Sequence, residues 1–537
     1  MKRQPERLQN ELFDLIIVGG GIIGSGIARD AALRGLSTLL VEKEDFACGT
    51  TSRSSRLIHG GLRYLRSLQW RLVRYDLKER EILLRIAPHL VRRLPFIIPL
   101  PRTETFYRIS LPFGLWLYDL LAIDQQAPRW KKFAAAAALE LEPALRGIKN
   151  LSGAYGYTDC EAGLMERLCL ENLLEAAQKG ACILNYASAT GITKSPSGVM
   201  GIEIQDMLTG ARYSARGRRV INATGHWADL VWKQFQVKTH HGLRKTKGIH
   251  LVTPKLSEKA LVLFAKSDGR LFFVIPWEDF SLIGTTDTDY AGDADRVYAT
   301  AQDVDYLVKE TARYFPGFDH SRILYTQAGL RPLVGRENIS ASATSRAHRI
   351  LDHASSGFPG LITVLGGKIT AHRGIAEEAV DRVCRQLEVS ARCITDSALL
   401  PGAPAVSLSE KESAAAVYGL PVDTIHHLAS IYGSQFTRVL DATQLEPRIK
   451  QPVCTGRRDI LAQIKWAVEN ESAVTIADFM LRRSLMGFAA DQGQAAVDTV
   501  AAEMAGYLKW DSSERQKQID SYSEFVKLGQ MWRNGTS

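Results

Sequence analysis

The sequence predicts a mixed α/β fold followed by a separate α-helical domain, and three observations support this prediction. Residues 13–42 have the pattern of a β-strand, a glycine turn, a helix and a second β-strand. A second strand, glycine pair and helix occur between residues 361 and 387. Beyond residue 406 the apolar residues recur almost entirely with helical spacing. Because 537 residues exceed one comfortable hydrophobic core, two or three domains are expected.

The first of these units has the features of a dinucleotide-binding fingerprint. The apolar β run Phe13–Val18 leads directly into Gly19, Gly21 and Gly24. In such a motif the first glycine makes the tight turn, the second lets the backbone approach a pyrophosphate, and the third lets the helix pack on the strand. The second β run ends in Glu42, which is placed to accept hydrogen bonds from a ribose diol. The unit therefore predicts a Rossmann-like domain that binds a dinucleotide.

The middle of the chain mixes helix and strand signals. Helical periodicity extends over Asp76–Leu90, Ala134–Leu141 and Glu161–Gln178. β signals follow at Gly198–Gln205, Arg218–Asn222, Gly248–Val252, Leu271–Ile275 and Ser281–Gly284. Strands of this kind, interleaved with the dinucleotide-binding domain, predict a mixed sheet that roofs a cofactor cleft.

The second strand–glycine–helix unit predicts a return of the chain to the cofactor. The β run Leu361–Val364 precedes Gly366, Gly367 and Lys368, and a helical pattern covers Ala371–Leu387. A helix that begins behind such a turn offers its amide groups to an anion. Residues 400–405 contain two prolines and a glycine and form the best linker in the chain, after which helical spacing dominates residues 407–527.

Composition and charge restrict the kind of protein without identifying it. The net charge of +9 suits anionic partners such as a phosphorylated substrate or an anionic membrane surface. The seven cysteines include no CxxC pair, so neither a zinc site nor a disulfide framework is expected, and no other metal site is predicted. No secretory signal and no stretch of 18 uninterrupted apolar residues is found, so we expect a soluble or peripherally membrane-bound protein without a transmembrane helix.

A third glycine turn favours one dinucleotide over another. The β run that ends in Asn222 continues into Ala223, Thr224 and Gly225. This turn resembles the one that brings a strand back beneath FAD in flavoproteins of the glutathione-reductase type. Together with Glu42 and the turn Gly366–Lys368 it favours FAD over NAD. We then expect an oxidoreductase module over residues 1–400 and a helical domain over 401–537, with FAD-binding parts at about 12–90, 180–230 and 355–390 and substrate-binding parts at about 91–180 and 230–355.

The segment Thr51–Leu65 carries a more specific resemblance. It resembles the FAD-dependent glycerol-3-phosphate dehydrogenases, the respiratory and membrane-associated kind, within the wider D-amino-acid-oxidase-like superfamily. Three positions depart from the family pattern: Ile23 stands where Asn is usual, His226 where Pro is usual, and no aspartate pair follows Asp159. Further segments that match are residues 247–250, 275–277, 283–287, 329–333, 366–368, 432–434 and 478–483.

The resemblance implies oxidation of sn-glycerol 3-phosphate to dihydroxyacetone phosphate, with electrons passed to a membrane quinone at the cytoplasmic face of the cell membrane. The three departures leave open an oxygen-using oxidase or a related flavoenzyme that acts on another hydroxy or amino acid. The positive charge suggests a flavin-bound tRNA-modifying protein as a more distant alternative. However, the basic residues are dispersed and no nucleic-acid-binding module is visible, so no nucleic acid partner is expected.

The resemblance also implies the site residues. A phosphate ester needs cationic donors, and an arginine guanidinium binds phosphate oxygens in pairs. The substrate pocket of the family corresponds to Arg63, Tyr64, Arg331, Arg346 and Lys368. Arg331, His59 and His250 are the catalytic candidates, since a neutral imidazole can take the hydroxyl proton near pH 7. The expected FAD contacts are Gly19, Gly21, Gly24, Glu42, Thr51, Ser52, Ser54, His59, Gly60, Gly61, Ala223, Gly225, Gly366, Gly367, Lys368 and Thr370.

An apolar segment with several aromatic residues, Phe106–Leu121, stands apart from these motifs. A segment of this composition with flanking cations fits the surface of a bilayer. It fits equally a buried core helix or a contact between two copies in a homodimer, and the sequence leaves these alternatives open. The flanking cations are Arg102, Arg108, Arg129, Lys131 and Lys132.

Overall fold

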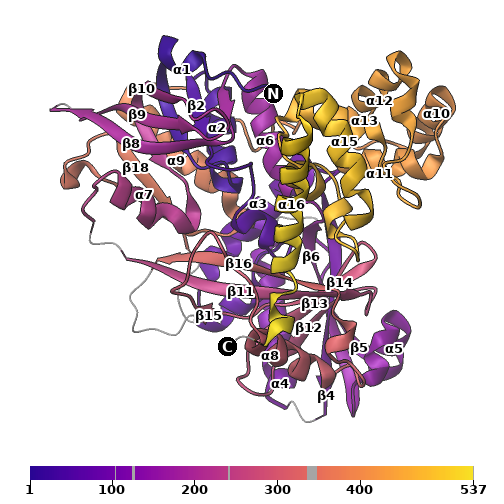
Figure 1. The fold of residues 1–537 in the computed structure, drawn as a ribbon. Coiled ribbons are helices and arrows are strands. Elements are labelled where there is room, and N and C mark those ends of the chain that lie inside the picture. Colours follow the sequence, from indigo (N-terminus) through magenta and orange to yellow (C-terminus); the bar gives the residue numbers. More distant parts are fainter. Residues whose placement is uncertain (103–104, 124–126, 197, 240–241, 335–346, 536–537) are drawn as a thin grey trace.

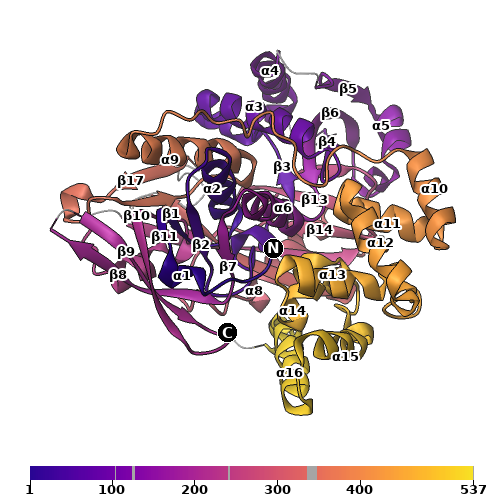
Figure 2. The same ribbon diagram turned by 90° about the horizontal axis from the view of Figure 1, so that it is seen from above.

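A computed structural model describes residues 1–102, 105–123, 127–196, 198–239, 242–334 and 347–535. Two mixed β-sheets lie side by side in the first 400 residues, and helices cover them (Figure 1). The helices after residue 407, orange and yellow in Figure 1, form a layer along one side of the molecule, which Figure 2 shows from above. This arrangement confirms the predicted fold class.

The first sheet contains the dinucleotide-binding fingerprint. Its strands are β1 (Leu12–Val18), β2 (Thr38–Val41), β7 (Cys182–Leu184), β8 (Ala187–Ser195), β9 (Gly198–Asp206), β10 (Arg212–Asn222), β17 (Arg349–Asp352) and β18 (Leu361–Leu365). The strand order is β17-β18-β10-β1-β2-β7, and β1 runs parallel to both β10 and β2. Because β1 is largely buried on both faces, its sequence is an apolar run rather than an alternating pattern.

The second sheet roofs the region next to the fingerprint. Its strands are β3 (Leu57–Ile58), β4 (Val91–Pro101), β5 (Lys131–Ala134), β6 (Leu151–Ala162), β11 (Leu243–Pro254), β12 (Ala260–Phe264), β13 (Leu271–Trp277), β14 (Phe280–Gly284), β15 (Thr288–Asp289) and β16 (Tyr325–Val334). The order is β15-β11-β14-β13-β12-β4-β6-β3, with β16 on β11 and β5 on β6. Most of its pairs are antiparallel, whereas β12 and β4 are parallel.

Helices of the first 400 residues cover both sheets. They are α1 (Arg7–Asn10), α2 (Ile22–Leu33), α3 (Trp70–Ile86), α4 (Thr105–Leu121), α5 (Ala135–Leu141), α6 (Met165–Gln178), α7 (Ala228–Gln234), α8 (Ala301–Ala312) and α9 (His372–Leu387). Apolar residues of α2, α6 and α9 share one core with the first sheet, and Figure 2 shows α2 between the other two. Residues 165–178, which the sequence assigns to the substrate-binding part, therefore pack beside the fingerprint.

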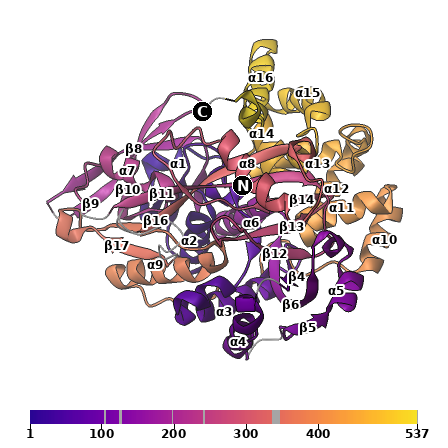
Figure 3. The same cartoon turned by 90° about the horizontal axis from the view of Figure 1, so that it is seen from below.

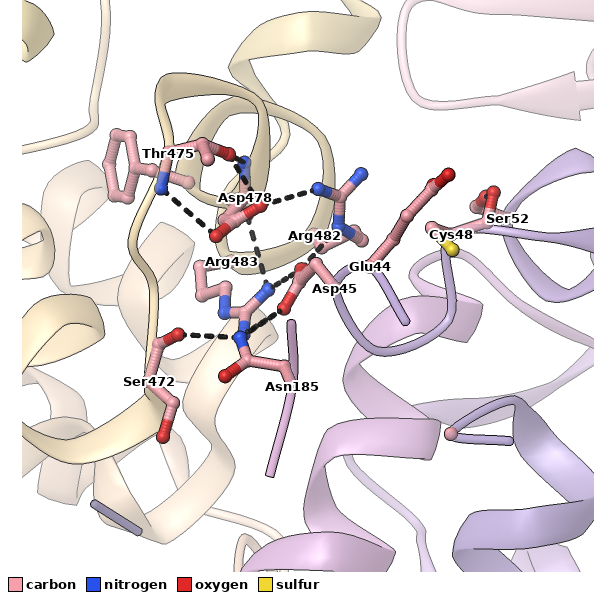
Figure 4. A network of polar contacts seen from close by, with 12 residues as sticks. Glu44, Asp45, Cys48, Ser52, Asn185, Ser472, Thr475, Asp478, Arg482 and Arg483 are labelled. Carbon is pink, nitrogen blue, oxygen red and sulfur yellow. Dashed lines mark hydrogen bonds and ion pairs between the residues drawn. The ribbon is translucent and has the colours of Figure 1, made fainter. Parts of the chain in front are cut away.

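The C-terminal domain is helical, as predicted. Its helices are α10 (Leu408–Tyr418), α11 (Val422–Tyr432), α12 (Phe436–Leu445), α13 (Leu461–Glu471), α14 (Ile476–Asp478), α15 (Val497–Leu508) and α16 (Ser512–Leu528). Arg482 and Arg483 both donate to Asp45 of the first domain, and all three side chains are buried (Figure 4). Since buried charges are tolerated only when they are paired, this contact fixes the two domains together.

Two predicted helix boundaries differ from the structure. The helix expected over Glu161–Gln178 begins at Met165, because Glu161 and Ala162 are the last residues of β6 and pair with Arg92 and Val91 of β4. The Arg92 guanidinium also donates to the Glu161 carboxylate at 2.8 Å, which favours the strand. The helix expected over Asp76–Leu90 runs instead from Trp70 to Ile86, since Ala87 leaves the helical conformation with φ −135°.

Candidate active site

A cleft of about 250 Å³ lies at the carboxyl ends of the parallel strands of the first sheet. Ligands bind at this edge in open α/β sheets because the strand ends and the following turns leave a crevice there. The predicted FAD contacts that line it are Gly19, Gly21, Glu42, Thr51, Ala223, Gly225, Gly366, Gly367 and Lys368. The other predicted FAD contacts, Gly24, Ser52, Ser54, His59, Gly60, Gly61 and Thr370, are not in this lining.

The glycine turn leaves room for a ligand on one side only. Gly19 has φ +109°, a conformation that favours glycine. A Cβ atom on Gly24 would overlap the carbonyl oxygen of Gly19, so Gly24 allows close packing of α2. A Cβ atom on Gly21 would meet only the Thr51 hydroxyl, at 3.5 Å. The space next to Gly21 is therefore left by the protein itself, as a phosphate-binding turn requires.

Glu42 lies at the rim of this cleft, where the sequence places it. Its carboxylate accepts hydrogen bonds from the Gly20 amide at 2.7 Å and from the Glu44 amide at 3.0 Å. Burial raises the pKa of this carboxyl group, although the two amides oppose the shift. Each carboxylate oxygen keeps a second lone pair. Glu42 can therefore still accept hydrogen bonds from the hydroxyl groups of a ribose.

The turn His59–Gly61 lies next to the cleft and is held from two sides. The His59 amide donates to the Thr370 hydroxyl at 3.0 Å, and the Gly60 amide donates to the Asp159 carboxylate at 3.2 Å. Gly61 has φ +80°, and a Cβ atom there would lie 2.7 Å from Lys368 Nζ. The three residues that the sequence assigns to FAD thus form a rigid turn beside the end of the cleft.

Three of the predicted substrate-binding residues lie together at this turn. Arg63 Nη2 donates to the Tyr64 hydroxyl at 2.8 Å. The Arg63 guanidinium lies 4.7 Å from the centre of the Tyr64 ring, and Lys368 Nζ lies 4.4 Å from it. Arg63 is exposed, whereas Lys368 is almost buried and forms an ion pair with the fully buried Asp76. Two cations therefore lie within 5 Å of one phenol ring, and such donors suit the recognition of a phosphate.

Arg331 and His250 come to the site from the second sheet. Arg331 donates to the Thr285 hydroxyl at 2.7 Å and pairs with Asp287 at 3.2 Å. His250 Nε2 lies 2.8 Å from the Ser55 hydroxyl. Pro332, which follows Arg331, lines the cleft together with Gly366. Arg331 itself is not in the lining of the cleft, and its guanidinium stays with Thr285 and Asp287. Arg346 lies outside the described residues.

The two candidate histidines differ in access. Burial lowers the pKa of His250 to about 3, and burial together with nearby Lys368 and Arg63 lowers the pKa of His59 well below 6.5. Both rings are therefore neutral at pH 7. Nδ1 of His250 is sealed from solvent without a hydrogen-bond partner among the described residues. His59 is half-buried, and its ring makes no hydrogen bond within the described part of the chain, so it is free to meet a substrate.

Asp76 and Tyr118 belong to the site although the motifs do not include them. Asp76 pairs with Lys368. The Tyr118 hydroxyl donates to both oxygens of Asp159 at 2.9 and 2.7 Å, and Asp159 in turn holds the Gly60 amide. The Tyr-x-Asp element at 157–159 is a sequence signal that could have indicated Asp159. Nothing in the sequence around Asp76 distinguishes it from an ordinary helix residue, and Tyr118 lies in the segment Phe106–Leu121, which the sequence does not connect with the site.

The buried Asp76 makes a pH-dependent contribution to stability. Burial raises the pKa of Asp76 to about 6, Lys368 lowers it, and the charges of Glu79 and Asp159 raise it. Unfolded Asp titrates near pH 4, so only the folded state holds the proton between pH 4 and 6. The contribution of Asp76 to the free energy of unfolding should therefore fall by about 3 kcal/mol as pH rises through this interval.

Urea unfolding of the wild type and of Asp76→Asn at pH 4, 5, 6 and 7 tests this linkage. The stability of the wild type minus that of the variant should decrease from pH 4 to 6 and then level off. Subtraction removes the carboxylates that the two proteins share. A difference that does not change with pH would show that Asp76 titrates in the folded state as it does in the unfolded chain.

Helix α4 contains the aromatic segment and is apolar on two opposite faces. Leu115, Tyr118 and Ala122 face inward and are buried. A second row, which we call the outer stripe, is between 44% and 75% exposed and consists of Ile109, Phe113, Trp116 and Leu120 of the helix and Ile123 in the turn that follows it. Successive members of the stripe are three or four residues apart and so share one face. α4 lies at the periphery of the molecule in Figure 3. Its inner half is thus core, while its outer half is an exposed apolar surface.

Among the described residues, no helix has both the length and the apolar character that crossing a membrane requires. Within the same residues, no three His, Cys, Asp or Glu side chains are grouped as metal ligands. All seven cysteines are free thiols.

Known proteins are similar to this chain in sequence and in fold. The FAD-dependent oxidoreductase family matches residues 14–382, and the C-terminal domain of alpha-glycerophosphate oxidase matches residues 393–515. A glycerol-3-phosphate dehydrogenase of Synechocystis is 38% identical over 98% of both chains. An aerobic glycerol-3-phosphate dehydrogenase of Staphylococcus haemolyticus is 34% identical over 95% of this chain and 94% of its own.

A solved structure extends the similarity to three dimensions. The glycerol-3-phosphate dehydrogenase from Bacillus halodurans complexed with FAD is 29% identical, covers 97% of this chain and 96% of its own, and superposes with a TM-score of 0.81. The cleft described above, with Gly21 open and Glu42 at its rim, fits FAD as the cofactor. The chain belongs to the FAD-dependent oxidoreductases, in the family of the glycerol-3-phosphate dehydrogenases.

Proposed function

We propose that the protein oxidises sn-glycerol 3-phosphate to dihydroxyacetone phosphate and passes the electrons to a membrane quinone. The observation that carries the substrate assignment is the group of Arg63, Tyr64 and Lys368 beside the cofactor cleft. The names of the relatives support the same substrate. Anaerobic addition of glycerol 3-phosphate should bleach the oxidised flavin spectrum of the purified protein, and an unchanged spectrum would refute the assignment.

The side chains divide the work of this reaction. The glycine turns and Glu42 would hold FAD, which would supply the acceptor for the hydride of the alcohol carbon. Arg63, Tyr64 and Lys368 bind the phosphate, and the guanidinium of Arg331 adds positive charge from the second sheet. His59 takes the hydroxyl proton, since its ring is neutral and has access to the substrate. Binding of the phosphate thus orients the alcohol carbon, and this positioning of the reacting atoms contributes to catalysis.

Arg63→Ala should weaken turnover of glycerol 3-phosphate about 10–150-fold in kcat/KM. Loss of one hydrogen bond to a charged group costs about 1.5–3 kcal/mol, and 1.4 kcal/mol corresponds to a factor of ten. Arg63→Lys should recover only part of this loss, because an ammonium group lacks the paired donors of a guanidinium. Steady-state kinetics with a soluble dye as acceptor measures both variants.

Arg71→Ala is the matched control for this experiment. Arg71 is also an exposed arginine, in the first turn of α3, and it stacks on Trp70 at 5.1 Å from the ring centre. Its kcat/KM should equal that of the wild type. If Arg63→Ala retains wild-type kinetics as well, Arg63 does not bind the phosphate.

We assign the outer stripe of α4 to the surface of a lipid bilayer. Arg108 on the same helix and Arg66 and Arg71 on the neighbouring segments are exposed, and cations of this kind suit anionic lipid headgroups. The inner face of α4 contacts the site, because a Cβ atom on Gly60 would lie 2.5 Å from the Tyr118 hydroxyl. A lipid-dissolved quinone would therefore meet the protein close to the flavin. Seven free thiols agree with the reducing cytoplasmic side of the membrane.

Trp116→Glu should reduce binding to vesicles about 10–150-fold. Burial of one large apolar side chain contributes about 1.5–3 kcal/mol, and a charged side chain cannot replace it. Sedimentation with liposomes that contain anionic lipid measures the change, while dye-linked activity should persist. Leu445→Glu is the control, because Leu445 is the most exposed leucine of the C-terminal domain but lies far along the chain from α4. Equal binding of Trp116→Glu and wild type would contradict the membrane assignment.

Oxygen is the competing electron acceptor. The match of residues 393–515 to the C-terminal domain of alpha-glycerophosphate oxidase keeps this alternative in view. The two acceptors give different products, since an oxidase releases one hydrogen peroxide for each glycerol 3-phosphate oxidised in air. We expect little peroxide and rapid reduction of a quinone in vesicles. Stoichiometric peroxide would identify an oxidase and leave the substrate assignment intact.

A further inference from the structure

A second cavity, of about 330 Å³, lies between the FAD-binding module and the C-terminal domain. One wall is the segment 44–53 that follows β2, another is the first half of β16, and a third is made by the C-terminal domain, including α16. Cys48 lines both this cavity and the FAD cleft. The proposed oxidation uses neither the cavity nor the side chains that converge on it.

Two guanidinium groups reach this cavity with donors to spare. Arg482 donates from Nε to Asp45 and from Nη2 to Asp478, which leaves Nη1 without a hydrogen bond among the described residues. Figure 4 shows this end of Arg482 turned towards the side on which Glu44, Cys48 and Ser52 lie. Arg53, which also lines the cavity, makes no ion pair or side-chain hydrogen bond within the described part of the chain. Burial lowers the pKa of Arg53, nearby Cys48 and Glu44 raise it in part, and the charge of Arg482 lowers it.

The carboxylates on the wall do not satisfy these donors. Asp45 is fully engaged, because its two oxygens accept from Arg482, Arg483 and Asn185. Glu44 is exposed and forms no hydrogen bond to either Arg53 or Arg482 in the described structure. The guanidinium of Arg53 and the remaining Nη1 of Arg482 border one space, and donors of this kind can bind an anion with several oxygens, such as a phosphate.

The remaining walls add acceptors and apolar surface. The side-chain oxygens of Gln492 and Gln327 are buried and have no hydrogen-bond partner among the described residues, and Gln492 as a whole is 6% exposed. Buried acceptors of this kind normally find a donor. Tyr298, Phe488 and Phe525 provide aromatic surface beside them. A ligand with hydroxyl groups on a carbon skeleton would satisfy both features.

We propose that this cavity is a second ligand site, which takes a hydroxylated organic phosphate. Arg53 and Arg482 bind the phosphate, and the amide oxygens of Gln327 and Gln492 accept hydrogen bonds from the hydroxyl groups. The ligand would contact both domains. It would also contact the segment that carries Cys48, a residue that lines the FAD cleft as well. The site is independent of the substrate position at Arg63 and Lys368.

Isothermal titration of the FAD-loaded protein with D-glucose 6-phosphate tests the proposal. We expect saturable binding of one molecule per chain, with the flavin spectrum unchanged and oxidised. Inorganic phosphate should bind more weakly, and D-glucose should not bind. Arg53→Gln should weaken binding about 10–150-fold, as expected for the loss of one charged donor.

Two variants of α16 separate occupation of the cavity from effects on folding. Ser521 is exposed on α16 and lines the cavity, so Ser521→Trp should fill it and abolish binding. Ser513→Trp, on the same helix but outside the lining, should bind as the wild type does. The proposal is wrong if the wild type does not bind glucose 6-phosphate or binds it no more tightly than inorganic phosphate. It is also wrong if Ser521→Trp binds normally, or if glycerol 3-phosphate displaces the ligand and Lys368→Ala abolishes its binding.

Discussion

Gly21→Val should give a folded protein that contains no FAD. The backbone at Gly21 has φ −77° and ψ −177°, which any residue adopts, and an added Cβ atom meets only the Thr51 hydroxyl at 3.5 Å. The valine side chain would therefore fit the protein but fill the part of the cleft in which the pyrophosphate lies. Absorbance near 450 nm should be absent from the purified variant, while its circular dichroism should match that of the wild-type apoprotein.

Gly24→Val is the informative comparison, because the two glycines lie three residues apart in one turn and serve different purposes. A side chain at Gly24 would overlap the carbonyl oxygen of Gly19, so α2 could not pack on β1. This variant should be unstable even before FAD is added. A yellow Gly21→Val protein with wild-type flavin content would contradict the assignment of the cleft. An unfolded Gly21→Val protein would show that the turn tolerates no side chain at all.

The sequence predicts well those elements whose apolar residues follow the burial pattern of a strand or a helix. β1 is buried on both faces and appears as an apolar run, and α9 (His372–Leu387) follows helical periodicity almost to the residue. The sequence pattern does not predict β4 and β6, although the two strands pair over most of their length. Their charged residues are satisfied by partners distant in the sequence, as when Arg80 of α3 binds Asp159 at 2.6 Å. Such pairs replace the polar–apolar alternation on which strand prediction depends.

In the site, too, residues that lie in sequence motifs are predicted, whereas residues whose role depends on a distant partner are not. The glycine turns, Glu42 and the cations Arg63 and Lys368 lie in motifs, and the structure gathers them at one edge of the first sheet. Asp76 lies in the middle of α3, and its importance arises only because Lys368 reaches it from a segment almost 300 residues later. Thr51 and Ser52 are both predicted FAD contacts, but they line different cavities. Thr51 lines the FAD cleft, and Ser52 lines the second cavity, which the C-terminal domain helps to form.

His59→Gln should lower kcat about 10²–10⁴-fold while the protein keeps its FAD. A positioned general base contributes about this factor to the rate. His59 is the better placed of the two histidines, because its ring is accessible and makes no hydrogen bond in the described structure, whereas Nδ1 of His250 is sealed from solvent. The rate of anaerobic flavin bleaching by glycerol 3-phosphate measures the chemical step directly. KM should change much less than kcat, because Arg63 and Lys368 still bind the phosphate.

His250→Gln is the matched control. His250 Nε2 lies 2.8 Å from the Ser55 hydroxyl, a contact that the amide of glutamine can replace, so the bleaching rate should fall less than about tenfold. Imidazole added to His59→Ala should restore part of the rate, since a free base can occupy the space of the missing ring, and it should leave His250→Ala unaffected. If His250→Gln instead loses a hundredfold or more while His59→Gln stays within tenfold of the wild type, His250 is the proton acceptor. The accessible ring of His59 would then serve only to shape the turn between Thr370 and Asp159.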